Sequence, residues 1–364
     1  MIKFPAAMIA CIAIPLICVN AHAEVKTIEA DSTYIMGDND SKVDARRVAI
    51  QEAKRKALEF AGTYVESLTQ VKDYQLSKDE VKSYTAGVME TEVVSEQMRG
   101  TTEHPEIYVK TRCKIDTDVL LKQIERYREN EDLKEQVQAT AKENEDLRKE
   151  REALVKQLAA EKDKSKADAT RQKLDTVLSQ EEANDDTNKV WNNYALQLAF
   201  GDGKEHDREI KPAELDRSFA VLQRAVKMNP QNLRARMMLA SIYERRGNTS
   251  AAESEFRSAV QRDPSNPLAH LRLGNLLKER GRYEEALNEF RVVERVRPHD
   301  PWMLFSTGMT YKATGRCGIA VSYLKRFLGD DRANQHPQMR ERAAETIREC
   351  GGERQGRPLR PRYR

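Results

Sequence analysis

Three prolines spaced by 34 residues constrain the fold of this chain more than any other sequence feature. Pro230, Pro264 and Pro298 mark the same point of a repeating unit. Four positions of the unit hold matching residues in all three copies. A small residue occurs at Ala240, Gly274 and Gly308, and a turn glycine at Gly247, Gly281 and Gly315. Alanine occurs at Ala252, Ala286 and Ala320, followed four residues later by a large apolar side chain at Phe256, Phe290 and Leu324. Such a period is typical of stacked helix pairs, which bury their apolar faces only against neighbouring units. The sequence predicts an all-α solenoid over residues 187–350.

The stretch GRYEEALNEFRVVERVRP, residues 281–298, is similar to the consensus of the tetratricopeptide repeat (TPR). An earlier, degenerate unit has Trp191 and Leu198 on its first helix and Leu222 on its second, and residues 338–350 fit a capping helix. The resemblance implies that positions 2, 5, 9 and 12 of each first helix line a concave face that binds partners. These positions hold Arg234, Met237, Ser241 and Glu244; Leu268, Leu271, Asn275 and Lys278; and Trp302, Phe305, Met309 and Lys312.

The predicted face becomes more apolar toward its C-terminal end. A cluster of Trp302, Phe305 and Met309 is costly to leave in water, so we expect a protein partner or part of this chain to cover it. Alternatively, Trp302 and Phe305 pack on the capping helix and bind nothing. The residues predicted to contact a partner are Met237, Leu268, Leu271, Asn275, Lys278, Trp302, Phe305, Met309 and Lys312.

Residues 24–119 have the pattern of a small α+β domain. Val25 to Met36 alternates like a strand, and from Ala45 a stripe of small and branched residues recurs at spacings of three and four. Residues 83–98 and 106–115 carry the β-branched content of two more strands. The helix ARRVAIQEAKRKALEFAGTYVESLT, the segment LSKDEVKSYTAGVMETEVVSE and the closing IYVKTRCKID resemble the N-terminal domain of the flagellar T-ring protein family and related envelope lipoproteins. The resemblance implies a role in an envelope assembly; a generic α+β domain is the alternative.

Residues 120–183 predict a long coiled-coil helix. Alternating gaps of four and three separate Leu133, Val137, Thr140, Asn144, Leu147, Arg151, Leu154 and Leu158. Asn144 at a core position favours a parallel dimer in register, because two buried amides satisfy each other only when aligned. We therefore expect a homo-oligomer, with a solvated single helix acting as a spacer as the alternative.

Residues 1–23 have the pattern of a secretory signal, with Lys3 before an apolar run and Ala21-His22-Ala23 as the cleavage site. We expect a protein of the periplasm or cell envelope. Of the cysteines that remain, Cys317 and Cys350 could form a disulfide between the last helix and the preceding repeat. Three reduced, buried thiols, Cys113 included, are the alternative.

The sequence carries no recognisable catalytic chemistry. Gly201-Asp202-Gly203-Lys204 lacks the first glycine and the hydroxyl residue of a phosphate loop, and the histidines have no metal-binding spacing. We expect no enzyme activity, no cofactor and no metal. A net charge of +3 gives no general attraction to nucleic acid. The basic tail, residues 351–364, is predicted to be disordered and could touch an anionic envelope surface.

Together these patterns predict a multidomain chain: a small α+β domain, a long coiled-coil helix and an all-α TPR solenoid. The first hypothesis for its function is a periplasmic adaptor that captures a protein partner on the TPR face. The second is a structural component of a flagellar or other envelope-spanning assembly, held by the N-terminal domain.

Overall fold

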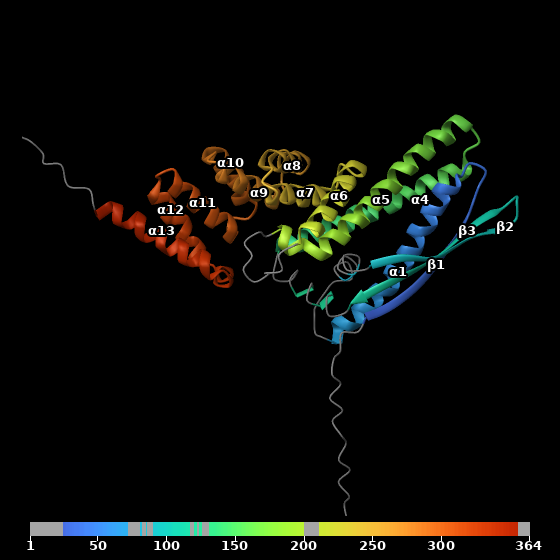
Figure 1. The fold of residues 1–364 in the computed structure, drawn as a ribbon, viewed down its shortest axis with the longest axis horizontal. Coiled ribbons are helices and arrows are strands. Elements are labelled where there is room, and N and C mark those ends of the chain that lie inside the picture. Colours follow the sequence, from blue (N-terminus) through green and yellow to red (C-terminus); the bar gives the residue numbers. More distant parts are fainter. Residues whose placement is uncertain are drawn as a thin grey trace, which may run out of the picture.

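The computed structural model of the chain describes residues 25–71, 90–116, 131–199 and 211–355, together with residues 81, 85, 120, 121, 124 and 125. The predicted signal segment, most of the insertion in the degenerate unit, and residues 356–364 of the predicted tail lie outside this part. The described chain is elongated, with a sheet at one end and a helical solenoid at the other (Figure 1).

The N-terminal unit is an antiparallel sheet covered on one face by a helix. Its elements are β1 (Val25–Ile35), α1 (Lys42–Val71), β2 (Glu90–Gly100) and β3 (Pro105–Asp116), and the strand order is β1-β3-β2. Helix α1 begins where Ser41 Oγ accepts a hydrogen bond from the Asp44 amide at 3.0 Å, a capping contact for otherwise unpaired helical donors. The predicted small α+β unit is confirmed.

The small side chains of α1 allow it to lie close against β1 and β3. Ala49 packs with Ile107 and Val109, and Ala57 packs with Cys113, all in the interior. Strand β2 forms one edge of the sheet, outside the cover of α1, so Val93 is 41% and Met98 55% exposed. The predicted second strand, residues 83–98, is placed at Glu90–Gly100 instead, with a bulge between Val93 and Ser95.

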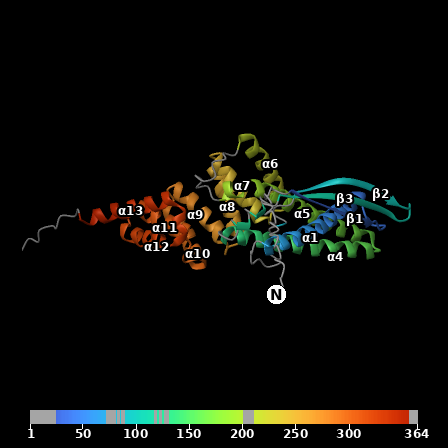
Figure 2. The same cartoon turned by 90° about the horizontal axis from the view of Figure 1, so that it is seen from below.

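The predicted long coiled-coil helix is a helical hairpin in the structure. Helix α4 (Glu131–Ala160) and helix α5 (Lys164–Ala199) lie side by side and are joined at residues 161–163 (Figures 1 and 2). Asp163 Oδ1 accepts from the Lys166 amide at 3.1 Å and thereby caps α5, while Glu161 Oε1 accepts from two amides of the turn. The turn contains neither glycine nor proline, and side-chain caps end one helix and begin the next.

Three leucines of the predicted seam are packed within this chain. Leu147, Leu154 and Leu158 are buried in one cluster with Leu174 and Leu178 of α5 and with Val48 of α1. Asn144 Oδ1 accepts a hydrogen bond from Asn184 Nδ2 of the same chain at 2.8 Å. The structure gives Asn144 a partner within its own chain and does not show the coiled coil in which it was expected to set the register of a parallel dimer, because a heptad pattern records only that a helix packs along one stripe.

The hairpin is fixed to the N-terminal unit by polar contacts from α1 and from the turn before it. The Arg47 guanidinium forms ion pairs with Asp175 at 2.5 Å and Glu182 at 2.7 Å. Asn39 Nδ2 donates to the carbonyl oxygens of Leu158 and Glu161, at 3.1 and 2.7 Å. Layers of sheet, α1 and hairpin therefore form one packed body, which spans two of the predicted domains.

The solenoid consists of paired helices that follow the 34-residue period. They are α6 (Pro212–Met228), α7 (Leu233–Arg245), α8 (Thr249–Arg262), α9 (Pro267–Glu279), α10 (Tyr283–Val296), α11 (Pro301–Ala313), α12 (Cys317–Leu328), the short 3-10 helix η1 (Asp331–Gln335) and α13 (Pro337–Gln355). Helix α5 packs on α6 and supplies the first helix of the degenerate unit, so it crosses the predicted boundary between coiled coil and solenoid. Helix α13 likewise extends into the predicted tail.

The small residues of the repeats lie where the two helices of a pair touch, as their spacing predicts. A Cβ added to Gly274 would lie 2.5 Å from the Phe290 ring, so only glycine lets α9 and α10 approach this closely. The sequence analysis missed one further periodic feature. The side chains of Asn232, Asn266 and Asp300, again 34 residues apart, each accept a hydrogen bond from the amide three residues later and cap the first helix of each repeat.

Candidate functional site

The surface formed by positions 2, 5, 9 and 12 of α7, α9 and α11 is called the first-helix face below. Its members on α7 are Arg234, Met237, Ser241 and Glu244; on α9 Leu268, Leu271, Asn275 and Lys278; and on α11 Trp302, Phe305, Met309 and Lys312. The structure divides them into buried and half-buried groups. The half-buried residues are Glu244, Asn275, Lys278 and the four residues of α11.

Three of the residues predicted to contact a partner belong to the interior of this chain. Met237 and Leu268 are buried in one cluster with Ala259 and Ala269, and Leu271 lies in the main core of the repeats. Their exposed fractions are 7%, 5% and 5%. The prediction that they are accessible to a partner was wrong, because neighbouring parts of the same chain pack over the positions that the repeat pattern assigns to the face.

The N-terminal end of α4 lies against the solenoid beside α7. Arg234 Nη2 donates to the backbone oxygen of Gln136 at 2.6 Å, and the guanidinium stands 4.5 Å from the centre of the Trp191 ring. Arg297, just before α11, forms an ion pair with Glu135 at 2.6 Å. Val137 is buried with residues of α7. A helix from outside the repeats therefore occupies the α7 side of the solenoid.

The α11 part of the face meets the C-terminal cap. The Trp302 ring lies 4.3 Å from the His336 ring, and Phe305 lies 5.3 Å from Phe327 of α12, centre to centre. Thr346 Oγ1 of α13 contacts the Met309 sulfur at 3.7 Å. Trp302 and Phe305 thus have ring partners within the chain, although His336 and Phe327 lie outside the capping helix that the alternative interpretation named, and both side chains are only half-buried.

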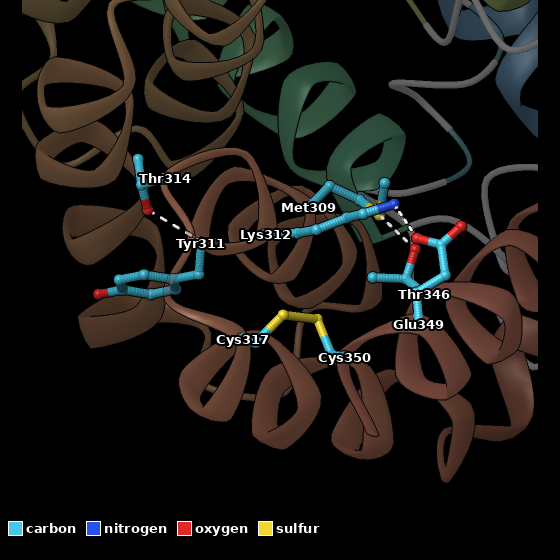
Figure 3. Close-up of a disulfide and its surroundings, with 8 residues drawn as sticks. All are labelled: Met309, Tyr311, Lys312, Thr314, Cys317, Thr346, Glu349 and Cys350. Atoms are coloured by element: carbon cyan, nitrogen blue, oxygen red, sulfur yellow. Dashed lines mark hydrogen bonds and ion pairs between the residues drawn. A yellow bond between two sulfur atoms is a disulfide. The ribbon is translucent and has the colours of Figure 1, made fainter. Parts of the chain in front are cut away.

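A disulfide between Cys317 and Cys350 joins α12 to α13 (Figure 3). It is the pair expected from the sequence, and the Cα atoms of the two residues are 5.2 Å apart. On the other side of α13, Lys312 forms an ion pair with Glu349, and both side chains remain partly exposed. Cys113 is free and buried in the sheet, where burial raises the pKa of its thiol. The disulfide therefore fixes α13 to α12, and the ion pair links α13 to α11 at the first-helix face.

Position 12 of the repeats carries charge. Burial raises the pKa of Glu244 to about 7, and Glu279 adds to this effect while Arg272 opposes it. One repeat later, burial lowers the pKa of Lys278, while the neighbouring Glu279 carboxylate raises it and Arg342 of α13 lowers it to a smaller extent. The Lys278 ammonium donates to Asn275 Oδ1 at 3.2 Å, which is a neutral partner. The half-buried face thus holds a partly desolvated carboxylate, Glu244, and a partly desolvated lysine, Lys278.

A buried group of amides, which the sequence analysis missed, attaches the hairpin to the solenoid. Asn184 of α5 donates to Asn144 and accepts from Asn229 at 3.0 Å and from Asn232 at 2.7 Å. Asn229 also donates to Glu143 at 2.6 Å. The side-chain amides of Asn184, Asn229 and Asn232 are hydrogen-bonded at both oxygen and nitrogen, by each other, by Glu143 and Thr187 and by backbone amides, which fixes the relative position of the elements that carry them. Asn229 and Asn232 flank the turn between α6 and α7, whereas Asn144 and Asn184 lie within α4 and α5, so no local sequence pattern links the four residues.

The described part of the chain holds no group of three or more His, Cys, Asp and Glu residues arranged to bind a metal ion. Within the same part, none of the helices combines the length and the apolar character needed to cross a membrane. The chemistry that the described face offers is non-covalent: apolar rings, a thioether and cationic side chains.

Known proteins share the repeat unit. A family model described as tetratricopeptide repeat matches residues 214–267 and 239–301. No curated protein matches the chain. Similar solved structures include YrrB, which is described as a TPR protein with an unusual peptide-binding site. Its sequence is 19% identical, the match covers 40% of this chain and 72% of YrrB, and the TM-score is 0.34.

Two further structures are of the same kind. MamA has 13% identity, a TM-score of 0.33 and coverage of 42% of this chain and 96% of that chain. A tetratricopeptide repeat protein from Parabacteroides merdae has 18% identity and a TM-score of 0.36, and the match covers 46% of this chain and 61% of that chain. The family match agrees with the helix pairs and their 34-residue period, and together they show that the chain carries TPR repeats within residues 214–301.

Proposed function

We propose that the chain is an exported envelope adaptor that binds a partner protein on the half-buried part of the first-helix face. The observation that carries this proposal is the group of Trp302, Phe305 and Met309, which keeps apolar surface in contact with solvent beside Lys278 and Lys312. Aromatic residues and methionine with a charged border are the composition of a protein interface. TPR proteins are typically scaffolds and not enzymes, which agrees with the absence of a recognisable catalytic motif in the sequence.

Two features support export. The first is the signal-like sequence of residues 1–23. The second is the disulfide between Cys317 and Cys350, because disulfides persist in oxidising compartments such as the periplasm and are rare in reducing ones. Both features have the same simple explanation, a mature chain that works beyond the inner membrane.

The packing of the N-terminal unit supports an adaptor with a fixed geometry. The hairpin contacts α1 through ion pairs such as Lys54–Asp185 at 2.5 Å, and contacts the solenoid through the buried amides around Asn184. A partner bound to the first-helix face would therefore be held at a defined place relative to the sheet. Leu147, Leu154 and Leu158 of the predicted seam are buried within the chain, so the proposal does not include oligomerisation through them.

Site-specific photo-crosslinking in cells tests the binding face. A photoreactive residue at position 312, where the lysine side chain is 36% exposed, is compared with one at position 325, an exposed lysine of α12 outside the face. We expect a discrete adduct with one other protein at position 312 and none at position 325. Crosslinks confined to this chain at both positions would contradict the proposal.

The exposed edge of the N-terminal sheet favours a second candidate function. Val93, Val94 and Met98 of β2 are each at least 40% exposed, and nothing in the described chain covers this strand on its outer side. An uncovered edge strand with apolar side chains is suited to assembly with other chains. The second candidate is thus a structural component of an envelope-spanning assembly, and co-sedimentation with the cell wall fraction, instead of a free periplasmic pool, would favour it.

A further inference from the structure

A histidine in the second repeat, formed by α9 and α10, is buried between two hydrogen-bond acceptors. The side chain of His270 is 6% exposed. Its Nδ1 atom lies 2.6 Å from Glu289 Oε2 of α10, and its Nε2 atom lies 3.0 Å from the backbone oxygen of Pro264, in the turn before α9. A carboxylate and a backbone carbonyl only accept hydrogen bonds, so both ring nitrogens must carry a proton to bond them. The protonated ring therefore joins the turn to α10.

The first repeat, formed by α7 and α8, contains the same link with a permanent charge. The residues 34 positions earlier are Arg236, Glu255 and Pro230. The guanidinium of Arg236 donates to Glu255 Oε2 at 2.5 Å and to the backbone oxygen of Pro230 at 3.2 Å. In the third repeat the equivalent position holds Leu304, which has no group to donate. Because arginine stays charged whereas histidine loses its proton near neutral pH, the same link responds to pH only in the second repeat.

We propose that His270 is a pH-sensitive link within the second repeat, complete while the ring is protonated and weakened when the ring becomes neutral. A neutral imidazole has a single N–H, so its other nitrogen would turn a lone pair toward the oxygen of Glu289 or of Pro264. The charged groups that act on the ring are Glu289 of α10 and Asp263, the residue that follows α8. Both are carboxylates, and both favour the protonated form.

The direction of the pH effect follows from the balance at the ring. Burial opposes the charge, but the hydrogen bonds to Glu289 and Pro264 and the nearby Asp263 outweigh it, so the pKa of His270 is raised above its ordinary value of 6.5. The link contributes fully below pH 6.5, and its contribution is lost as the pH rises through the higher pKa of the folded chain. Because α9 carries residues of the first-helix face, a rise in pH should loosen that part of the face. The inference concerns the fold of the second repeat and holds whether or not the face binds a partner.

Hydrogen exchange of the mature chain at about pH 6 and about pH 9, followed by mass spectrometry, tests the inference. Rates are divided by those of an unstructured peptide at the same pH, which leaves the protection due to structure. We expect protection of α9 and α10 to fall at least about tenfold between the two pH values, the effect of losing one hydrogen bond to a charged group.

Two substitutions separate His270 from other titrating groups. His270→Arg copies the first repeat and should remove the fall in protection. His104→Arg is the matched control, because it makes the same replacement at an exposed residue between β2 and β3, and it should keep the fall. The titration of other groups, Glu244 included, is common to all three chains. An undiminished fall in His270→Arg, or protection of α9 in the native chain that does not change with pH, would overturn the inference.

Nuclear magnetic resonance of the chain with labelled histidines measures the protonation directly. The ring signal that His270→Arg removes belongs to His270, and in the native chain its titration midpoint should lie above pH 6.5. Glu289→Gln replaces the carboxylate with a neutral amide and should lower the midpoint of the same signal, so the assignment does not depend on the fold of His270→Arg. A midpoint at or below pH 6.5 in the native chain would show that the ring is not the charged link, and the inference would fail.

Discussion

The disulfide between Cys317 and Cys350 should strongly stabilise the packing of α13 on α12, which together form the C-terminal cap of the solenoid. The two cysteines are 33 residues apart, and the closed loop contains α12, η1 and α13. In the chain-entropy description, closing a loop of this length restricts the unfolded chain by about 4 kcal/mol. Replacing both cysteines with serine removes this restriction, and we expect the unfolding free energy of the cap to fall by about 2–4 kcal/mol.

The contacts that α13 keeps in the double serine variant determine which part of the chain loses stability. Ala343 is buried in the repeat core, and Ile347 and Met339 pack against it, so α13 should still dock in the double variant. It should open more often, since the disulfide no longer holds its C-terminal end. Hydrogen exchange resolved by mass spectrometry should therefore show faster exchange in α13, with exchange in β1, β3 and α1 unchanged.

Reduction of the native chain is the matched control, because it breaks the same bond without changing the sequence. It should reproduce the faster exchange of α13. Thiol counting by mass should find one free thiol, Cys113, in the mature oxidised chain. Unchanged protection of α13 in both the variant and the reduced chain would refute the reasoning, and reactive thiols at Cys317 and Cys350 in the chain purified without reductant would show that the bond does not form.

Three further predictions concern single side chains. The pKa of Glu244 in the folded chain, about 7, is above its ordinary value, so between about pH 4.5 and pH 7 the folded chain binds more protons than the unfolded chain. The free energy of unfolding should therefore fall by on the order of 2 kcal/mol as the pH rises through this range. Glu244→Gln should flatten this dependence of the unfolding free energy on pH, measured by urea unfolding. Gly274→Ala should destabilise the chain by about 1–2 kcal/mol in the same assay, since its methyl group meets the Phe290 ring, whereas Gly318→Ala, with open space around it, should be neutral or slightly stabilising. Asn184→Ala should cost about 3 kcal/mol by leaving buried amides unpaired, and sedimentation should show an unchanged oligomeric state.

The sequence determined the repeats because their requirements are local. Each unit needs a small residue where two helices touch, a glycine of positive φ at the turn, and a cap before the first helix. Gly274, Gly281 and Asn266 meet these needs in one repeat, and their counterparts recur at the same spacing. The small α+β unit was predictable for a similar reason, since the stripe of alanines on α1 has the spacing of a helix that lies close to a sheet.

The sequence alone could not decide what each apolar stripe packs against. The heptads around Asn144 predicted a second copy of the chain, but the partner is α5, because a capped turn at Asp163 folds the helix back on itself. The first-helix face was assigned to the right repeat positions, yet α4 and α13 decided how much of it stays accessible. These helices are distant in the sequence from the residues they cover, and only the tertiary structure brings Glu135 to Arg297 and Arg342 to Lys278. Burial is a property of the assembled chain, so a repeat pattern can place a side chain on a face without determining whether solvent, a partner or its own chain lies against it.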